Sequence, residues 1–141
     1  MTAYLLDTDV VAALRHGPDA APALHRWLDS VADDAIYLSA LTMGELQRVV
    51  VKLRHDDPKG AMALDAWLGI LIRGHGDRIL PVTAAVSRCW GELPLGPGTR
   101  GCDGLLVATA HAYGLVLATG RTRDLTSLGI QCVDPFQHST G

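Results

Sequence analysis

The chain has 141 residues, of which 48% are hydrophobic and 19% are charged, a balance typical of globular proteins and not of disordered ones. The formal net charge of −3 gives no bulk argument for a nucleic-acid partner, so any nucleic-acid site would have to be local. No apolar run approaches the ~20 residues that a membrane span needs, and no basic, leader-like segment opens the chain, so we expect a cytoplasmic protein with no membrane partner.

Short apolar runs alternate with longer stretches of helical periodicity, and together they predict the elements in chain order. A strand near 3–7 is followed by helices over 9–15 and 20–32, and a strand near 35–38 by helices over 42–54 and 59–73. A strand near 78–82 precedes helices over 83–93 and 102–113, with further strands near 115–118 and 130–133. Strands separated by helices imply right-handed crossovers and a parallel sheet covered on both faces. We therefore predict one α/β domain over residues 1–141, with three α/β/α layers and a central parallel sheet of about five strands.

Three acids each stand where a buried segment meets the start of a predicted helix. Asp7 ends the first apolar run, Glu45 follows the second predicted strand, and Asp103 opens an almost wholly apolar helix. A carboxylate beside a core is costly unless it is paired, hydrogen-bonded or metal-bound. Ligands of parallel sheets bind beyond the carboxyl ends of the strands, and Asp7, Glu45 and also Asp124 fall there by sequence. Asp103 reaches that edge only if the loop before it crosses back.

Each of these acids also has a purely structural alternative. Asp7 suits the N-cap of the helix that follows it, and residues 42–45, Thr-Met-Gly-Glu, match a capping box that includes Glu45. Asp103 suits the positive end of its helix dipole, and Asp124 suits a turn or a cap. The individual signals are weak, so only their combination favours a shared site.

The residue types at this edge favour a hard divalent cation. Carboxylates without a histidine among them predict Mg²⁺ (or Mn²⁺) as the cofactor, and we expect Asp7, Glu45 and Asp103 to lie within reach of one ion. The histidines of the chain show no zinc-binding spacing. The cysteines are scattered without a CxxC pair, which indicates a reducing compartment.

Three segments carry these acids in a recognisable order. Residues 4–11 read YLLDTDVV, residues 37–46 read YLSALTMGEL, and residues 102–110 read CDGLLVATA. They resemble the first, second and third motifs of PIN domains, of which the second is the most specific. Their order and spacing, with VDPF at 133–136, are similar to VapC-type toxins of bacterial type II toxin–antitoxin pairs. The resemblance covers nearly the whole chain.

The resemblance implies a metal-dependent endoribonuclease that cleaves RNA phosphodiester bonds. Divalent ions suit this chemistry because they make water nucleophilic and neutralise charge on the phosphate. Asp7, Glu45 and Asp103 match the three core acids of the family. The fourth position departs from the pattern, because Arg121 stands where many relatives have Asn or Asp, while Asp124 matches a later acid. Either Asp124 completes the catalytic site or the site uses three acids, and Arg121 could instead contact the scissile phosphate.

Basic side chains near the acids are the candidate RNA contacts. Arg100, Arg121 and Arg123 stand on predicted loops that flank Asp103 and Asp124, and we predict that they contact RNA. A second basic group lies on the predicted helix that carries Glu45 and leads away from the acids: Arg48, Lys52 and His55. This group also suits an ordinary solvated helix face. By resemblance we further expect a homodimer that a cognate antitoxin holds inactive.

Two alternative functions stay open. Residues 7–11, DTDVV, also resemble the nucleophile motif of haloacid-dehalogenase-like phosphatases, in which Asp7 would be phosphorylated and Asp9 would act as acid and base. That family needs a lysine, and neither Lys52 nor Lys59 follows a predicted strand. A degenerate PIN domain that binds RNA or protein without cleavage is favoured only by Arg121 at the fourth position.

Overall fold

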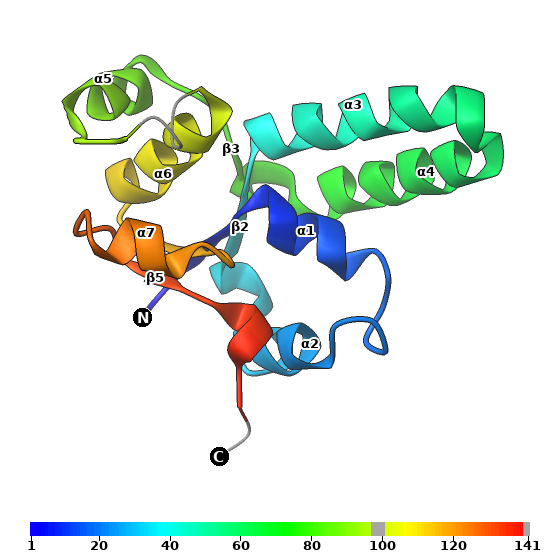
Figure 1. Ribbon diagram of the computed structural model, residues 1–141, viewed down its shortest axis with the longest axis horizontal. Coiled ribbons are helices and arrows are strands. Elements are labelled where there is room, and N and C mark those ends of the chain that lie inside the picture. The colour runs from blue at the N-terminus through cyan, green and yellow to red at the C-terminus, as the bar shows by residue number, and fades with distance from the viewer. Residues whose placement is uncertain (97–100, 140–141) are drawn as a thin grey trace.

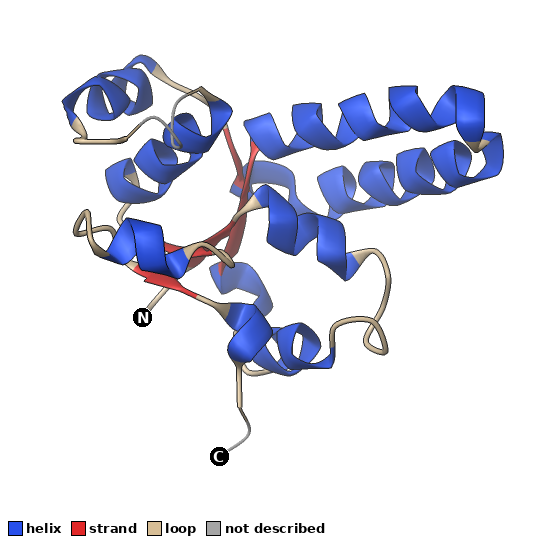
Figure 2. Cartoon of the chain, in the orientation of Figure 1, coloured by secondary structure: helices blue, strands red, loops and turns tan. Residues whose placement is uncertain are grey.

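Five parallel strands form the central sheet, in the order β3-β2-β1-β4-β5, as the computed structural model in Figures 1 and 2 shows. The structure describes residues 1–96 and 101–139. The strands are β1 (Tyr4–Leu6), β2 (Ile36–Ser39), β3 (Ile79–Leu80), β4 (Val116–Ala118) and β5 (Cys132–Val133). The predicted parallel sheet is therefore confirmed, with strands that are shorter than expected or shifted by one residue.

Helices connect the strands and confirm the predicted α/β class. They are α1 (Thr8–Leu14), α2 (Pro22–Asp29), α3 (Ala40–Asp56), α4 (Pro58–His75), α5 (Ala84–Glu92), α6 (Cys102–Ala112) and α7 (Thr122–Thr126). Short 3-10 turns cover η1 (Asp33–Ala35), η2 (Gly76–Arg78) and η4 (Pro135–Gln137). Only α7 was not predicted, because its 5 residues are too few to show helical periodicity.

Alternate side chains of the strands supply two cores, one on each face of the sheet. On β1, Leu6 packs in a cluster with Val10 of α1 and Leu46 of α3. The neighbouring Leu5 points to the other face and packs in a cluster with Leu106 of α6. Helices α1 to α4 therefore contribute to one face and α6 and α7 to the other, with α5 packed against α6 (Figure 1). The three layers are those predicted.

Helices α3 and α4 form a long hairpin that extends away from the sheet (Figure 1). The chain breaks between them at Pro58, because proline cannot donate the backbone hydrogen bond that a continuing helix requires. Asp57 caps α4, and its Oδ1 accepts a hydrogen bond from the Gly60 amide at 3.0 Å. A small separate core that includes Val50 and Leu64 holds the two helices together.

The parallel topology places the carboxyl ends of β1, β2 and β4 at one edge of the sheet. The residues that follow these strands, or end them, are Asp7, Ser39 and Thr119, and all three are buried. The Asp7 amide donates to the carbonyl oxygen of Ala118 at 2.9 Å, which ties the start of α1 to the end of β4. Among the described residues, no helix is long and apolar enough to cross a membrane.

Candidate active site

Asp7 is the most buried acid at the carboxyl edge of the sheet, with a relative exposure of 3%. Its Oδ1 accepts a hydrogen bond from the Thr8 amide at 2.8 Å, so Asp7 is the N-cap of α1. Its Oδ2 accepts hydrogen bonds from Thr119 Oγ1 at 2.7 Å and from Arg121 Nη2 at 2.9 Å. The structural alternative for Asp7 is therefore confirmed. A cap uses only one of its two oxygens, and the other faces a cation.

Glu45 lies in the second turn of α3 and reaches back to α1. Its Oε1 accepts a hydrogen bond from Thr8 Oγ1 at 2.8 Å, and Thr8 Oγ1 also bonds to the Thr42 hydroxyl at 2.9 Å. The predicted capping box is wrong, because α3 begins earlier, at Ala40, and Ser39 caps it by accepting from the Leu41 amide. Helix capping therefore does not account for Glu45.

Asp103 lies in the first turn of α6 and forms an ion pair with Arg121. Arg121 Nη1 is 3.2 Å from Asp103 Oδ2, while Nη2 of the same guanidinium is 2.9 Å from Asp7 Oδ2. The Arg121 amide also donates to Thr119 Oγ1 at 3.1 Å. Burial lowers the pKa of Arg121, but attraction to Asp7, Asp103 and Asp9 outweighs burial and raises that pKa above its ordinary value. The guanidinium therefore stays charged between the two carboxylates.

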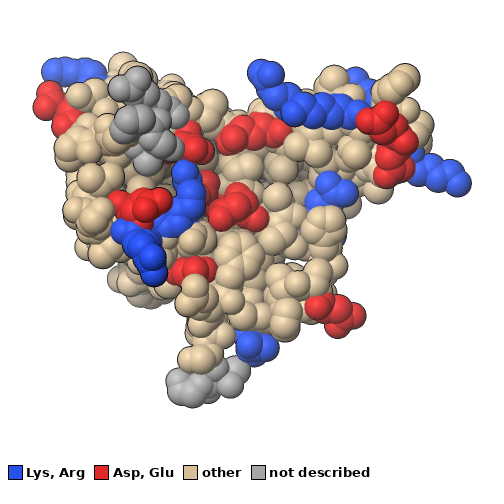
Figure 3. All heavy atoms as spheres, viewed as in Figure 1, with Lys and Arg blue, Asp and Glu red and all other residues tan. Residues whose placement is uncertain are grey.

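A continuous chain of polar contacts thus joins the three predicted acids. It runs from Glu45 through Thr8 to Asp7, and from Asp7 through Arg121 to Asp103. The acids come from three segments that are far apart in the sequence, and the first turn of α6 lies at the carboxyl edge, as the prediction required of Asp103. In Figure 3, acidic side chains gather in the middle of this face with basic side chains among them.

Asp9 also belongs to this cluster, although it was weighed only for the phosphatase alternative. Its Oδ1 accepts from the Val10 amide at 2.8 Å and its Oδ2 from the Gly120 amide at 3.2 Å. Burial, followed by repulsion from Asp7, raises the pKa of Asp9, while both amide hydrogen bonds and Arg121 oppose the shift. The second acid of the Asp-Thr-Asp segment was the signal that could have identified it.

The other predicted site residues are not joined to the acids. Asp124 is exposed in the first turn of α7, and among the contacts of the described residues its carboxylate takes part in no hydrogen bond or ion pair, with Arg121 or any other residue. Arg123 is exposed on the same helix, and Arg100 lies outside the described residues. The second basic group is exposed on α3, as a solvated helix face would be: Arg48, Lys52 and His55.

The acids suit a divalent cation in kind, but this conformation does not gather three of them around one ion. Within residues 1–96 and 101–139, no group of three or more His, Cys, Asp or Glu side chains is placed to hold a metal. The expectation that Asp7, Glu45 and Asp103 lie within reach of one ion is therefore not met here. Instead, the Arg121 guanidinium supplies the positive charge between Asp7 and Asp103, while Glu45 accepts from Thr8. Hard oxygen donors that already hold a cationic group fit Mg²⁺ or Mn²⁺.

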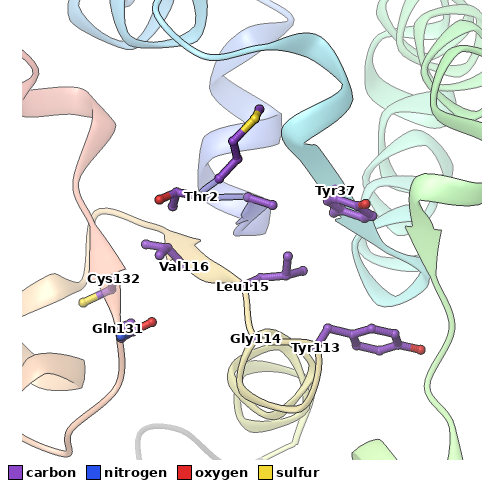
Figure 4. A pocket seen from close by; sticks show the side chains of 10 residues that line it. Thr2, Tyr37, Tyr113, Gly114, Leu115, Val116, Gln131 and Cys132 are labelled. Carbon is purple, nitrogen blue, oxygen red and sulfur yellow. The ribbon is translucent and has the colours of Figure 1, made fainter.

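A broad hollow of the described surface lies at the opposite edge of the sheet (Figure 4). Its volume is about 760 Å³, and its lining includes Thr2, Tyr37, Tyr113 and Gln131. Ala3, Leu115 and Val116, which also line it, stand at the amino ends of β1 and β4. No charged side chain lines this hollow, so it offers none of the groups that the predicted chemistry requires.

Residues 4–125 match the PIN domain family, so the chain belongs to that family. It is 30% identical over 138 residues to the toxin FitB of Neisseria gonorrhoeae, an alignment that covers 94% of this chain and 97% of FitB. It is 28% identical over 139 residues to the VapC ribonuclease Y4jK of Sinorhizobium fredii, with 94% and 97% covered. The structure of FitAB bound to an IR36 DNA fragment superimposes with a TM-score of 0.80 at 26% identity, covering 96% of this chain and 97% of the other.

The family match decides between two of the alternatives. The predicted resemblance to PIN domains of the VapC type is confirmed. The alternative prediction of a haloacid-dehalogenase-like phosphatase is therefore wrong. The structure agrees, because Lys52 and Lys59 are exposed on the α3–α4 hairpin and neither forms an ion pair with Asp7 among the described contacts.

Asp9→Asn is expected to stabilise the metal-free protein at neutral pH by at most a few degrees of melting temperature. The folded-state pKa of Asp9 is raised above 3.8, so the folded protein binds more protons than the unfolded chain between the two pKa values. The contribution of Asp9 to the free energy of unfolding therefore falls as pH rises through that window. Below the pKa of Asp9 in the unfolded chain, this contribution does not change with pH. Melting curves of wild type and Asp9→Asn in EDTA should differ at pH 7 and converge near pH 4. Asp19→Asn, at an exposed loop position, is the control, and a more stable wild type at pH 7 would contradict the prediction.

Proposed function

We propose that the chain is an Mg²⁺- or Mn²⁺-dependent endoribonuclease toxin that acts in the bacterial cytoplasm and is held inactive by a cognate antitoxin. The observation that carries the proposal is the buried Asp7 carboxylate, connected to Glu45 and Asp103 at the carboxyl edge of the sheet. The three acids stand in segments that match PIN domains, and relatives include a VapC ribonuclease.

Asp7, Glu45 and Asp103 would hold the metal ion. When bound, such an ion supplies a nucleophilic water and neutralises charge on the phosphate. Hydrogen bonds within the chain orient two of these acids in the metal-free protein. Thr119 Oγ1 and the Thr8 amide orient Asp7, and Thr8 Oγ1 orients Glu45. Loss of such a hydrogen-bonded support typically lowers metal affinity or activity by roughly 10- to 100-fold.

RNA would contact the basic groups beside the acids. Arg123 is exposed on α7, two residues from Arg121, and its guanidinium suits a phosphate oxygen. Arg121 is partly exposed, with 32% of its side-chain surface accessible, so a phosphate could also reach its free edge. The six aromatic side chains of the Trp and Tyr types and the single Phe form no evident stacking platform, which favours backbone contacts over base recognition.

A partner protein is proposed from the relatives whose solved structures are toxin–antitoxin complexes, FitAB among them. A groove of about 440 Å³ between α1, α2 and α4 offers an apolar surface for an antitoxin segment, lined by side chains that include Leu14, Leu28 and Ile70. We also propose a homodimer. A monodisperse monomer in light scattering at micromolar concentration would contradict the dimer.

Asp124→Ala is expected to leave RNA cleavage within a few-fold of wild type, because the Asp124 carboxylate is exposed and contacts none of the other acids. Asp103→Asn in the same assay should lower the rate by a factor on the order of 10² or more, as for other positioned catalytic groups. Initial rates at fixed salt and Mg²⁺ concentration provide the comparison. An equal loss in both variants would restore Asp124 as the fourth catalytic acid.

One observation favours a second function, a PIN domain that binds RNA or protein without cleaving RNA. Arg121 forms ion pairs with two of the three acids, and the described residues gather no three-acid metal site. A non-cleaving domain would bind RNA equally well with or without divalent ions.

Brief induction of the protein in a bacterial host, followed by sequencing of RNA 5′ ends, separates the two functions and identifies the RNA target. We expect growth arrest and new internal 5′ ends at a few positions with wild type, and neither with Asp103→Asn. Identical 5′ ends in the two cultures would contradict nuclease activity and favour the binding function.

A further inference from the structure

We propose that Arg121 is a built-in counter-cation of the acidic site. Its guanidinium occupies the site in the metal-free protein and must leave Asp7 before a divalent ion can bind. The inference rests on the proposed function, because it deepens the description of the same site.

The geometry is that of a cation bridging two ligands. A single guanidinium places Nη2 at 2.9 Å from Asp7 Oδ2 and Nη1 at 3.2 Å from Asp103 Oδ2. Its backbone is fixed as well, because the Arg121 amide donates to Thr119 Oγ1. Thr119 Oγ1 donates in turn to the same Asp7 oxygen at 2.7 Å. The planar fork of arginine suits this bridging role, in which a lysine would supply only a point charge.

The hydrogen bonds to Asp7 leave few free acceptor positions for a metal ion in addition to Arg121. A carboxylate oxygen accepts about two hydrogen bonds, and Asp7 Oδ2 already accepts from Thr119 Oγ1 and Arg121 Nη2. Oδ1 accepts from the Thr8 amide. An ion bound through Oδ2 would also stand within a few ångströms of the guanidinium, and like charges at such distances disfavour one another. Binding of a metal ion through Oδ2 and the Arg121–Asp7 ion pair therefore compete with each other.

The metal-free fold gains from the ion pair. Asp7 is 3% exposed and has Asp9 as an acidic neighbour that repels it. Removing one partner of such a pair leaves an uncompensated, buried charge, which destabilises a protein. Arg121 thus stabilises the metal-free site and competes with the metal. Replacing Arg121 should therefore lower the stability of the metal-free protein and raise its affinity for the metal. Replacing a merely solvated loop arginine would change neither quantity.

Isothermal titration of MgCl₂ and MnCl₂ into the metal-free full chain measures the competition. We expect Arg121→Gln to bind either ion more tightly than wild type, by a factor on the order of ten or more, within the range usual for coupled binding equilibria. The same variant should melt at a lower temperature than wild type in EDTA and gain more on addition of metal. Arg121→Lys keeps the charge without the fork and should fall between the two.

Arg123→Gln is the matched control, because it removes an equal charge two positions away from Arg121. The Arg123 side chain is exposed and has no ion pair among the described contacts. Its metal affinity should equal that of wild type. Asp7→Asn in the same titration shows whether the ion measured is bound at this site, since its loss of affinity identifies Asp7 as a ligand.

A side-chain NMR measurement on wild type tests the exchange without any substitution. The Arg121 Nη–Hη signals, assigned by their absence from Arg121→Lys, should be protected from solvent exchange in EDTA, because Nη2 and Nη1 pair with Asp7 and Asp103, and should lose that protection at saturating Mg²⁺. An unchanged, protected signal at saturation would overturn the proposal, even if Arg121→Gln failed to fold.

The outcomes of the titration separate this proposal from the proposed function. Equal or weaker metal affinity in Arg121→Gln, with binding that Asp7→Asn abolishes, overturns the competition and leaves the metal site intact. No binding by either wild type or Arg121→Gln overturns both the competition and the metal dependence. Tighter binding by Arg121→Gln alone, with Arg123→Gln unchanged, supports the proposal.

Discussion

Asp7→Asn is expected to lower RNA cleavage by a factor on the order of 10² or more, with most of the loss in kcat. Asp7 is the proposed ligand most fully enclosed by the protein, and three donors fix its two oxygens. An asparagine keeps an oxygen acceptor of nearly the same shape but removes the negative charge that a divalent ion requires. Initial cleavage rates of a defined RNA over a series of Mg²⁺ concentrations measure the effect.

The fold should survive this substitution, because the amide oxygen still accepts a hydrogen bond from the Thr8 amide and Arg121 keeps its ion pair with Asp103. Asp65→Asn, at an exposed position on α4, is the matched control and should cleave at the wild-type rate. Circular dichroism of both variants checks folding. A rate for Asp7→Asn equal to that of Asp65→Asn would show that this carboxylate takes no part in catalysis.

Leu117→Ala is expected to lower the free energy of unfolding by about 2 to 5 kcal/mol, the range for removing a fully buried leucine from a packed core. Leu117 is 0% exposed on β4 and belongs to the core cluster that contains Leu5 and Leu106. The strand is hydrogen-bonded on both sides, to β1 and β5, so its backbone cannot move far to fill the cavity. Chemical denaturation at equilibrium measures the change.

Val116→Ala on the same strand is the matched control, since Val116 is only partly buried and its side chain points to the opposite face. Its loss should be about 1 kcal/mol or less. Because β4 leads directly to Thr119, Leu117→Ala should also weaken metal binding as it loosens this edge of the sheet. Similar losses of stability in the two variants would contradict the placement of Leu117 in the central core.

The fold could be predicted from the sequence because each strand joins a short apolar run to a helix of clear periodicity. β1 illustrates this, since Leu5 and Leu6 are both buried, on opposite faces of the sheet, as a strand covered on both sides requires. The bounds of α3 could not be predicted. Ser39 and Thr42 are both good capping residues, and only the tertiary structure selects Ser39, by placing the Thr42 hydroxyl against Thr8.

The candidate site was predictable in its acids but not in its connections. Asp7, Glu45 and Asp103 could be named because each stands near the start of a predicted helix within a family motif. The ion pairs of Arg121 depend on the path of the chain after β4 and on a rotamer that reaches two elements at once. No periodicity encodes such a contact, so the sequence left Arg121 and Asp124 as alternatives for the fourth position.

Cleavage of one defined RNA by the purified protein, with Mg²⁺, with Mn²⁺ and after chelation by EDTA, tests most directly whether these acids form a metal-dependent nuclease site. Mapping the ends of the products distinguishes internal cuts from trimming. We expect internal cuts with either ion, none after chelation, and recovery when the ion is restored in excess. Equal cleavage in EDTA, or no cleavage at ion concentrations that saturate the titrated site, would contradict the proposed function.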